Sequence, residues 1–415
     1  MSGEHRTETV VIGAGQAGLA LSWHLSRAER PHVVLERGRI GERWRSERWD
    51  SLTLLSPAWA SLLPGQGPYP DPDAFLGRDT FVDELEQYAW SFLAPVVEGA
   101  TVVSVRRHED GYHVATDRDT WLARNVVVAT GDCGVPFVPP QAAGVPQGVA
   151  SLHAVRFRTP EGLPPGAVLV VGSGPTGQQL ALDLARSGRE VTLAVGRHAR
   201  LPRRYRGRDI WEWLDRLGDF DVSIDEVADP AAARRAPSVA VTGANGGEPL
   251  DLQVLHEAGV DVRGRLLVFA GRHAVFSDGL DAEVERAEVR MRRILARVDE
   301  LAEREGHEVA PEHVREIDLP PSARALDLRD TGVGTVLWAT GYRRAYPWLH
   351  LPVLDADGEI VQHHGVTAAP GLHTLGLRFQ RRRGSHFIGG VGADAELLAA
   401  RIAAGDGARA EDLAA

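Results

Sequence analysis

Two stretches of the chain repeat one succession of apolar and polar positions. Residues 9–37 and 168–197 each begin with an unbroken apolar run, followed by a glycine-rich turn, a segment with apolar residues at helical spacing, and a second apolar run. Unbroken apolar runs are typical of parallel strands that are buried on both faces. Each stretch therefore predicts a strand, a turn, a helix and a second strand.

Both turns have the spacing GxGxxG. The glycines are Gly13, Gly15 and Gly18 in the first stretch and Gly172, Gly174 and Gly177 in the second. In this motif the first glycine permits a tight turn, the second lets a pyrophosphate approach the backbone, and the third lets the helix pack closely on the strand. The start of the helix presents free N–H groups and its positive dipole end to the phosphates. Two such turns predict two dinucleotide sites in one chain.

The two stretches differ where the second strand ends. The first ends in Glu36, a carboxylate placed to accept hydrogen bonds from a ribose 2′-hydroxyl, which fits FAD or NAD. The second ends in Arg197, which could pair with the 2′-phosphate of NADPH, helped by Arg203 or Arg204. We therefore predict FAD in the first site and NADPH in the second, because hydride transfer from NADPH to a flavin requires both.

These units predict an α/β fold with two Rossmann-like dinucleotide-binding domains, the NADPH domain being inserted into the FAD domain. Two similar stretches, 125–139 and 335–349, support this organisation: each is an apolar strand that ends in Ala-Thr-Gly and continues into a proline-containing loop. The boundaries are placed at stretches rich in proline and glycine. We expect the FAD domain at 1–160 and 331–404, the NADPH domain at 161–330 with a helical insertion at about 200–310, and a flexible tail at 405–415.

Three further elements are predicted outside the two units. Residues 101–116 have the pattern of a β-hairpin that turns at Asp110-Gly111. Residues 280–306 have apolar positions at helical spacing, which predicts a long amphipathic helix whose apolar stripe packs into the core. After Arg383, a glycine turn leads into a last helix.

Charge and hydropathy exclude several classes of partner. The net charge of −11 argues against a nucleic-acid binder, because phosphate contacts require a basic surface. No apolar run approaches the roughly 18–20 residues that cross a bilayer, and the polar first residues do not have the apolar segment of a signal peptide. We expect a cytoplasmic protein without membrane contact, and we leave a homodimer open.

The rare residue types exclude several chemistries. The single cysteine, Cys133, excludes an internal disulfide and a CxxC redox pair. The chain contains no lysine, which excludes Schiff-base catalysis and the lysine of a Walker loop. We predict no metal site, because His363-His364 has neither a helical HxxxH partner nor a nearby acid cluster in the sequence.

With these residues in place, the chain resembles the class B flavin monooxygenases, which include the flavin-containing monooxygenases, the plant YUCCA enzymes and bacterial CzcO-like flavoproteins. The resemblance covers about residues 8–404 and rests on GAGQAG at 13–18, the segment 41–65, both ATG stretches, GSGPTG at 172–177 and the segment 375–395. It implies that NADPH reduces FAD, that O2 forms a C4a-peroxyflavin, and that one oxygen atom passes to a small organic substrate by N-, S- or Baeyer–Villiger oxidation.

The units and the resemblance together give the candidate cofactor-binding residues. They are Gly13, Gly15, Gln16, Ala17, Gly18, Glu36, Arg37, Arg43, Trp44, Leu54, Val103, Ala129, Thr130, Gly131, Gly172, Ser173, Gly174, Pro175, Thr176, Gly177, Arg197, Arg203, Ala339, Thr340 and Gly341. We assign no catalytic residue, since the chemistry of an oxygenated flavin needs positioning and exclusion of water more than acid–base groups.

Some positions depart from the family pattern or admit two interpretations. The segment 51–60 has Leu55 and Ala58 where relatives place an asparagine that bonds the flavin peroxide, so backbone groups and bound NADP would take over that contact. His153 fits either a mobile interdomain linker or a structural role.

Two questions about function also stay open. The aromatic residues Trp211, Trp213, Tyr346 and Trp348 fit either a substrate pocket or the core. The alternative functions are an NADPH-dependent reductase of a quinone or another acceptor, and a non-enzymatic flavin redox sensor.

Overall fold

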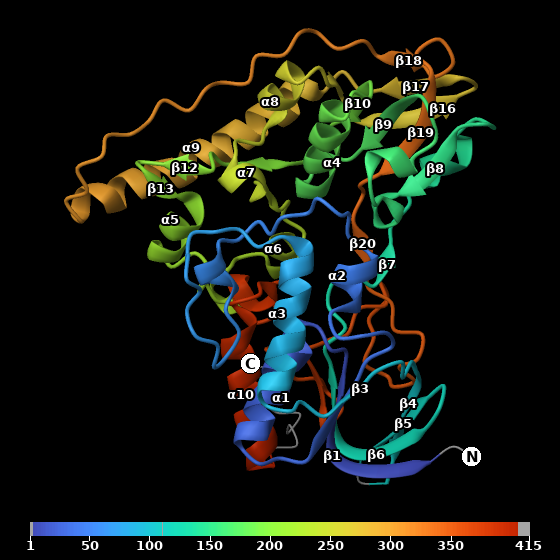
Figure 1. Ribbon diagram of the computed structural model, residues 1–415, viewed down its shortest axis with the longest axis vertical. Helices are drawn as coiled ribbons and strands as arrows, with labels where there is room; N and C mark the ends of the chain where they lie inside the picture. The colour runs from blue at the N-terminus through green and yellow to red at the C-terminus, as the bar shows by residue number, and fades with distance from the viewer. Residues whose placement is uncertain (1–2, 110, 406–415) are drawn as a thin grey trace.

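The computed structural model describes residues 3–109 and 111–405, and its two largest β-sheets lie at opposite ends of the molecule (Figure 1). The first sheet has seven strands in the order β3-β2-β1-β6-β5-β4, with β21 also paired to β6. Its strands are β1 (Glu4–Ile12), β2 (His32–Leu35), β3 (Val96–Val97), β4 (Val102–His108), β5 (Gly111–Thr116), β6 (Thr120–Val128) and β21 (Leu372–Thr374). Strands β1, β2, β3, β6 and β21 are parallel, and β4 and β5 form an antiparallel hairpin.

The apolar run at residues 10–12 lies in the middle of this sheet, paired with β2 on one side and β6 on the other. Helices α1 (Gln16–Arg27), α3 (Arg78–Ser91) and α10 (Val391–Ala404) share one hydrophobic core with residues of β1, β2 and β6. The predicted hairpin is confirmed by β4 and β5, although Asp110 of its turn lies outside the described residues. The expected last helix is α10.

The second sheet has five parallel strands in the order β15-β10-β9-β19-β8. They are β8 (Ala150–His153), β9 (Ala167–Val171), β10 (Val191–Ala194), β15 (Asp261–Arg263) and β19 (Val333–Trp338). Helices α4 (Pro175–Arg186) and α8 (Leu252–Glu257) share a core with this sheet. A three-stranded antiparallel sheet of β16 (Leu266–Ala270), β17 (His273–Phe276) and β18 (Ala325–Asp327) contributes to a second core beside it. Two Rossmann-like parallel sheets confirm the predicted fold class.

The long amphipathic helix is confirmed as α9 (Leu280–Arg304), whose apolar stripe packs with Trp213 and Tyr205 in a separate core. The chain before α9 also forms short elements: α5 (Ile210–Arg216), α6 (Pro230–Arg234), α7 (Ala244–Gly247), β11 (Ala199–Arg200), β12 (Arg204–Tyr205), β13 (Arg208–Asp209), β14 (Val239–Ala240) and the 3-10 helix η5 (Ile224–Glu226). The expected insertion at about 200–310 is therefore not only helical, since β15, β16 and β17 also lie within it.

The pairing of strands corrects the expected domain boundaries. Strand β8 precedes residue 161 and β19 follows residue 331, yet both lie in the second sheet. The chain passes between the sheets at β7 (Val135–Pro136) and returns at β20 (Tyr342–Arg343), and these two strands pair with each other (Figure 1). The second ATG stretch therefore ends a strand of the second sheet, which the sequence likeness to the first ATG stretch did not reveal.

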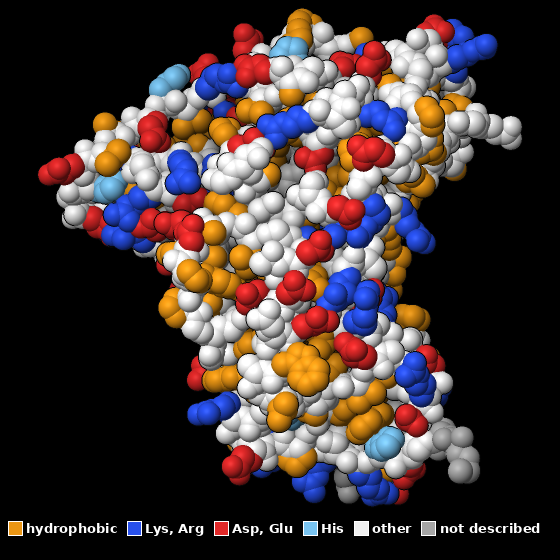
Figure 2. All heavy atoms as spheres, viewed as in Figure 1, with side chains coloured by type: hydrophobic (Ala, Val, Ile, Leu, Met, Phe, Trp, Pro, Cys, Tyr) orange, Lys and Arg blue, Asp and Glu red, His pale blue; other side chains and the backbone are white. Residues whose placement is uncertain are grey.

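The surface in the view of Figure 2 carries acidic and basic side chains that are mixed, with apolar groups between them. None of the described helices combines the length and apolar character that a bilayer crossing needs. The C-terminal helix ends at Ala404 and is followed by Gly405, which has a left-handed backbone conformation, and the rest of the expected tail lies outside the described residues.

Candidate functional site

A first cavity of about 410 Å³ lies where β1, β2 and β6 end. Eleven of the predicted cofactor-binding residues line it, namely Gly13, Gly15, Gln16, Ala17, Glu36, Arg37, Arg43, Trp44, Ala129, Thr130 and Gly131. They come from the glycine turn, the end of β2, the segment that contains α2 (Glu42–Ser46), and the first ATG stretch after β6. Eleven of the 27 lining residues were therefore among those predicted from the sequence.

The backbone of the first turn has the shape that a bound phosphate requires. Gly13 has a φ of 108°, and a Cβ there would lie 2.8 Å from the carbonyl oxygen of Ala129. A Cβ on Gly18 would collide with the carbonyl oxygen of Gly13, so this glycine packs the helix against the turn. A Cβ on Gly15 would meet nothing within 4 Å, which leaves its backbone open to a ligand.

Glu36 holds the turn together from the end of β2. Its side chain is buried, and its Oε2 and Oε1 accept hydrogen bonds from the N–H groups of Ala14 (2.8 Å) and Gly38 (3.0 Å). Each carboxylate oxygen has a second lone pair, so Glu36 can still accept a hydrogen bond from a ribose hydroxyl in the cavity that it lines.

Three of the residues predicted for the first site do not line the first cavity. Gly18 lies within α1, and Leu54 lines a second cavity. Val103 is 49% exposed, whereas its neighbour Val102 is 8% exposed and lines the first cavity. Adjacent residues of a strand point to opposite faces, so the prediction on β4 is wrong by one residue.

The first cavity also has residues that sequence reasoning missed as site residues, including Arg48, Asp132 and Cys133. The Arg48 guanidinium donates hydrogen bonds to the Cys133 sulfur (3.5 Å) and to the Tyr342 hydroxyl (3.3 Å). Asp132 and Cys133 directly follow the first ATG, and this proximity was the signal in the sequence that could have identified them.

The second glycine turn repeats the geometry of the first. Gly172 has a φ of 111°, and a Cβ there would lie 2.5 Å from the carbonyl oxygen of Ala339. A Cβ on Gly174 would meet nothing within 4 Å. The N–H of Ala339 donates to Val171 O, as the N–H of Ala129 donates to Ile12 O, both at 2.9 Å. The second ATG stretch, Ala339 to Gly341, thus begins beside the second turn as the first ATG stretch begins beside the first.

The remaining predicted residues of this turn lie at the start of α4. Ser173 lies within the turn and Pro175, Thr176 and Gly177 open the helix. The Ser173 hydroxyl bonds both the N–H and the carbonyl oxygen of Gly196 at 3.2 Å, which ties the turn to the end of β10.

Arg197 and Arg203 lie in different environments. Arg197 is exposed just beyond β10, and its side chain has no hydrogen bond or ion pair to the residues that the structure describes. Arg203 is 3% exposed: its guanidinium donates to Asp209 Oδ2 (2.8 Å) and to Leu55 O (2.7 Å), and it lies over the Phe75 ring. Burial lowers the pKa of Arg203. The prediction that Arg203 meets a 2′-phosphate is wrong, because interior partners occupy its donors.

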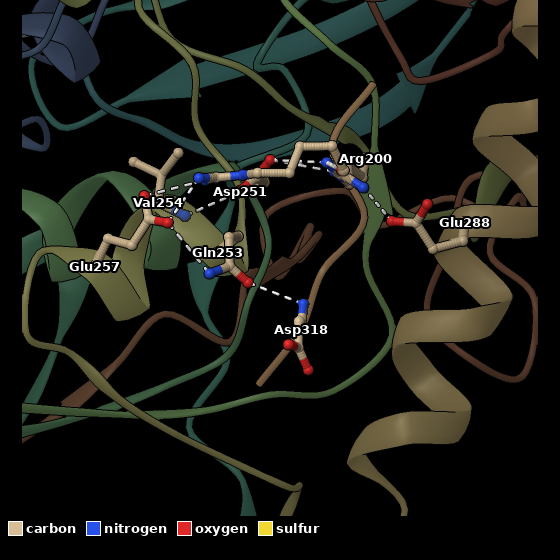
Figure 3. A network of polar contacts seen from close by, with 8 residues as sticks. Arg200, Asp251, Gln253, Val254, Glu257, Glu288 and Asp318 are labelled. Atoms are coloured by element: carbon tan, nitrogen blue, oxygen red, sulfur yellow. Dashed lines mark hydrogen bonds and ion pairs between the residues drawn. The ribbon is translucent and has the colours of Figure 1, made fainter. Parts of the chain in front are cut away.

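A network of polar contacts fixes the segment that follows Arg197 (Figure 3). The buried Arg200 pairs with Asp251 (3.0 Å), which caps α8, and with Glu288 of α9. This network holds the long helix against the second sheet, and it also keeps Arg200 away from any ligand at the turn.

A second cavity of about 480 Å³ lies next to the first, and Gln16 and Trp44 line both. Its walls come from the insertion, residues 201–241 and Ile294, and from residues 54–56 and 378–388. Of the four aromatic residues in question, Trp211 lines this cavity and Trp348 lines the first, while Trp213 and Tyr346 are buried in cores.

His153 has two hydrogen bonds: its Nε2 pairs with Gly341 O (3.0 Å) and its Nδ1 accepts from the N–H of Val155 (3.1 Å). Burial lowers the pKa of His153. It therefore joins the second ATG stretch to β8.

His363 and His364 meet an acid that lies far away in the sequence. Both Nε2 atoms lie within 2.9 Å of an oxygen of Asp225. Their rings are stacked at a centroid distance of 4.0 Å and an angle of 19°, and together with Asp225 they bring three potential ligand atoms within 4.8 Å of one another. The acid that the sequence does not show beside the histidine pair is thus supplied by η5.

The sequence of this chain is similar to those of known oxidoreductases. The family pattern described as pyridine nucleotide-disulphide oxidoreductase matches residues 10–211. The chain is 31% identical to an uncharacterized CzcO-like oxidoreductase of Geobacillus kaustophilus over 95% of this chain and 98% of that protein. It is 33% identical to the indole-3-pyruvate monooxygenase YUCCA1 of Oryza sativa over 45% of this chain and 47% of that enzyme.

A solved structure has the same fold. The flavin-containing monooxygenase of Stenotrophomonas maltophilia superposes with a TM-score of 0.67 at 20% identity, covering 96% of this chain and 99% of that one.

Proposed function

This chain belongs to the CzcO-like oxidoreductases of the pyridine nucleotide-disulphide oxidoreductase family, and we propose that it acts as an FAD-containing, NADPH- and O2-dependent monooxygenase. Its family makes it a flavin-dependent oxidoreductase and implies FAD and NAD(P)H as its cofactors. The proposal adds that one oxygen atom of O2 enters a small organic substrate by N-, S- or Baeyer–Villiger oxidation.

The observation that carries the proposal is the contact between the two cavities. The first cavity has the features of a dinucleotide site, and the second is a separate, mainly apolar cavity that shares Gln16 and Trp44 with it. A reductase of a dissolved acceptor needs only access to its flavin. A monooxygenase also needs an apolar place beside the flavin that holds the substrate and limits water.

The residues present fit both nucleotides. The open backbone at Gly15, the uncapped start of α1 and the Glu36 carboxylate would hold the pyrophosphate and ribose of FAD. The open backbone at Gly174 and the exposed Arg197 would hold the diphosphate and the 2′-phosphate of NADPH. When bound, the two nucleotides supply hydride transfer and the activation of O2.

The chain itself positions the flavin and the substrate and limits the access of water to them. Trp44 lies at the junction of the cavities, in edge-to-face contact with Phe81 at a centroid distance of 5.0 Å, and the Arg48 guanidinium lies over its ring at 5.5 Å. These contacts fix the Trp44 ring as a wall between the two cavities. We infer that this ring and Gln16 set the distance between the flavin and the substrate.

The test is to mix FAD-loaded protein with NADPH in air and to follow flavin absorbance, O2 consumption and hydrogen peroxide. A monooxygenase reduces its flavin with NADPH, reoxidises it slowly, and releases much less peroxide than the NADPH it consumes once a substrate is present. Prompt reoxidation with one peroxide per NADPH contradicts the proposal and favours a reductase. A flavin that NADPH does not reduce leaves a redox sensor.

A further inference from the structure

The walls of the second cavity determine the kind of molecule that fits it. Trp211 lies 5.0 Å from Phe220 and 5.1 Å from Phe387, measured between ring centroids, and Phe220 meets Phe387 edge to face at 5.5 Å. Most other lining side chains are aliphatic, among them Leu201, Leu214, Val239, Val241 and Ile294. Three rings at such angles offer both faces and edges to a flat apolar group.

The charged side chains of the cavity are unequally paired. Asp219 accepts hydrogen bonds from Arg297 (2.6 and 3.3 Å) and lies 3.8 Å from Arg383, so its charge is balanced. The half-buried Arg378 donates to the carbonyl oxygen of Ala236 (2.5 Å), and no carboxylate of the described residues lies within ion-pair distance of it. The cavity wall therefore carries one guanidinium charge without an anion.

The surroundings of Arg378 do not supply that anion. Asp132 and Glu359 both pair with Arg344. Arg234 is also half-buried and bonds only the carbonyl oxygen of Phe379 (3.4 Å). Burial lowers the pKa of Arg378 and of Arg234, and the charge of Arg344 adds to both effects, although arginine stays protonated at neutral pH. Three guanidinium groups share two carboxylates here, so an incoming anion would be stabilised.

His386 adds a hydrogen-bonding group to the same cavity. Burial lowers its pKa to about 4, so the ring is neutral at pH 7. Its Nδ1 is buried without a hydrogen-bond partner among the described residues. An unpartnered buried ring nitrogen costs free energy unless a ligand supplies the partner.

We propose that the substrate is a carboxylic acid with an aromatic or similarly flat apolar body, whose carboxylate pairs with Arg378 while its body packs against Trp211, Phe220 and Phe387. This inference rests on the proposed function, since it assigns the second cavity to the substrate. The volume of about 480 Å³ lies within the range of pockets for small ligands, about 300–1,000 Å³.

The test is calorimetric binding of 3-phenylpropanoate and its neutral analogue 3-phenylpropanamide to purified, FAD-loaded protein. We expect the acid to bind at least about tenfold more tightly than the amide, because only the acid can form a charge-assisted pair with the guanidinium. R378Q should abolish this preference by weakening the acid alone, and R378K should retain part of it. The matched control is R235Q, which removes an exposed arginine two residues from the cavity-lining residues Ala233 and Pro237 and should leave the preference unchanged.

The same variants distinguish a substrate carboxylate from a phosphate of NADPH as the anion. We expect R378Q to leave the Kd of NADPH unchanged. A loss of NADPH affinity with an intact acid preference assigns Arg378 to the dinucleotide and overturns the proposal, as does equal binding of acid and amide or no binding of either. Because calorimetry needs no turnover, acid binding in a protein that fails the oxygen test would overturn the monooxygenase and leave the acid site standing.

Discussion

The two glycine turns have the same backbone and different chemistry at the end of the next strand. Gly13 and Gly172 have φ values of 108° and 111°, and each lies against the carbonyl oxygen of an ATG alanine. Yet Glu36 is 8% exposed and already bonds two N–H groups of its turn, whereas Arg197 is exposed and its side chain has no hydrogen bond or ion pair to the described residues. In the proposed function, the shared backbone binds a phosphate at both turns, and the side chain at the end of the next strand selects the nucleotide.

This difference also fits the expected roles of the two nucleotides. An acid that is ordered before the ligand arrives loses little entropy on binding, which favours a ligand that stays. An exposed arginine without such partners must be ordered at each binding event, which suits a ligand that exchanges.

A substitution at the third glycine should distort the backbone that the two turns share. We expect it to lower the free energy of unfolding more than any other change considered below. G18A would place a Cβ against the carbonyl oxygen of Gly13. We expect G18A to lower the free energy of unfolding by about 3 kcal/mol in urea titrations, near the upper end of the usual cost of overpacking. G177A should act similarly, because its Cβ meets Gly172 in the same way. The control is G15A, whose Cβ meets nothing, and it should leave stability within about 0.5 kcal/mol.

A lower pH should destabilise the fold of the first sheet, because that sheet contains a buried imidazole. His373 of β21 is 1% exposed, and burial lowers its pKa to about 4. The folded chain therefore binds fewer protons than the unfolded chain, whose histidine pKa is about 6.5, so this stability is lost as the pH falls from about 6.5 towards 4. Between pH 7 and 5 we expect a loss of about 2 kcal/mol that H373L removes and the exposed-site control H350A does not. An unchanged slope in H373L would show that His373 is not the titrating group.

Replacing Glu36 tests the ordered acid. E36Q keeps the size of the side chain but replaces one acceptor oxygen by a donor, which cannot serve both Ala14 N–H and Gly38 N–H. We expect a loss of about 1–2 kcal/mol in unfolding free energy together with weaker FAD retention after gel filtration. If E36Q retains FAD as the native chain does, the acid serves only the turn.

Replacing Arg197 tests the exposed residue that follows the second turn. This change should have the smallest effect on stability. R197A should leave stability unchanged and raise the Kd of NADPH by about tenfold, with NADH unaffected, because only NADPH carries the 2′-phosphate. R106Q, at an exposed site on β4, is the control. Equal effects of R197A on both nucleotides would remove the assignment of Arg197 to the 2′-phosphate.

The sequence was sufficient for features that are local in the chain. Both turns, their glycines and Glu36 follow from short patterns, because a buried parallel strand and a phosphate turn each impose their own residue types. The long helix α9 follows from its spacing for the same reason.

Features that depend on distant segments could not be predicted. The similarity of the two ATG stretches did not indicate which sheet contains β19. In both sheets an alanine of such a stretch lies against a glycine turn. Arg203 has the right chemistry for a phosphate but meets Asp209, Leu55 and Phe75 inside the fold. The second cavity is formed by residues from Gln16 to Ile388, and no local pattern marks such a set.

The pairing of β7 with β20 means that the chain leaves the first sheet and returns to it at one place. Residues 137–341 can then be regarded as a cassette whose two ends are neighbours. A short linker across Pro136 and Tyr342 would close the gap without stretching the remaining polypeptide, so the part of the chain with the second glycine turn could be exchanged between relatives while the part with the first glycine turn keeps its frame.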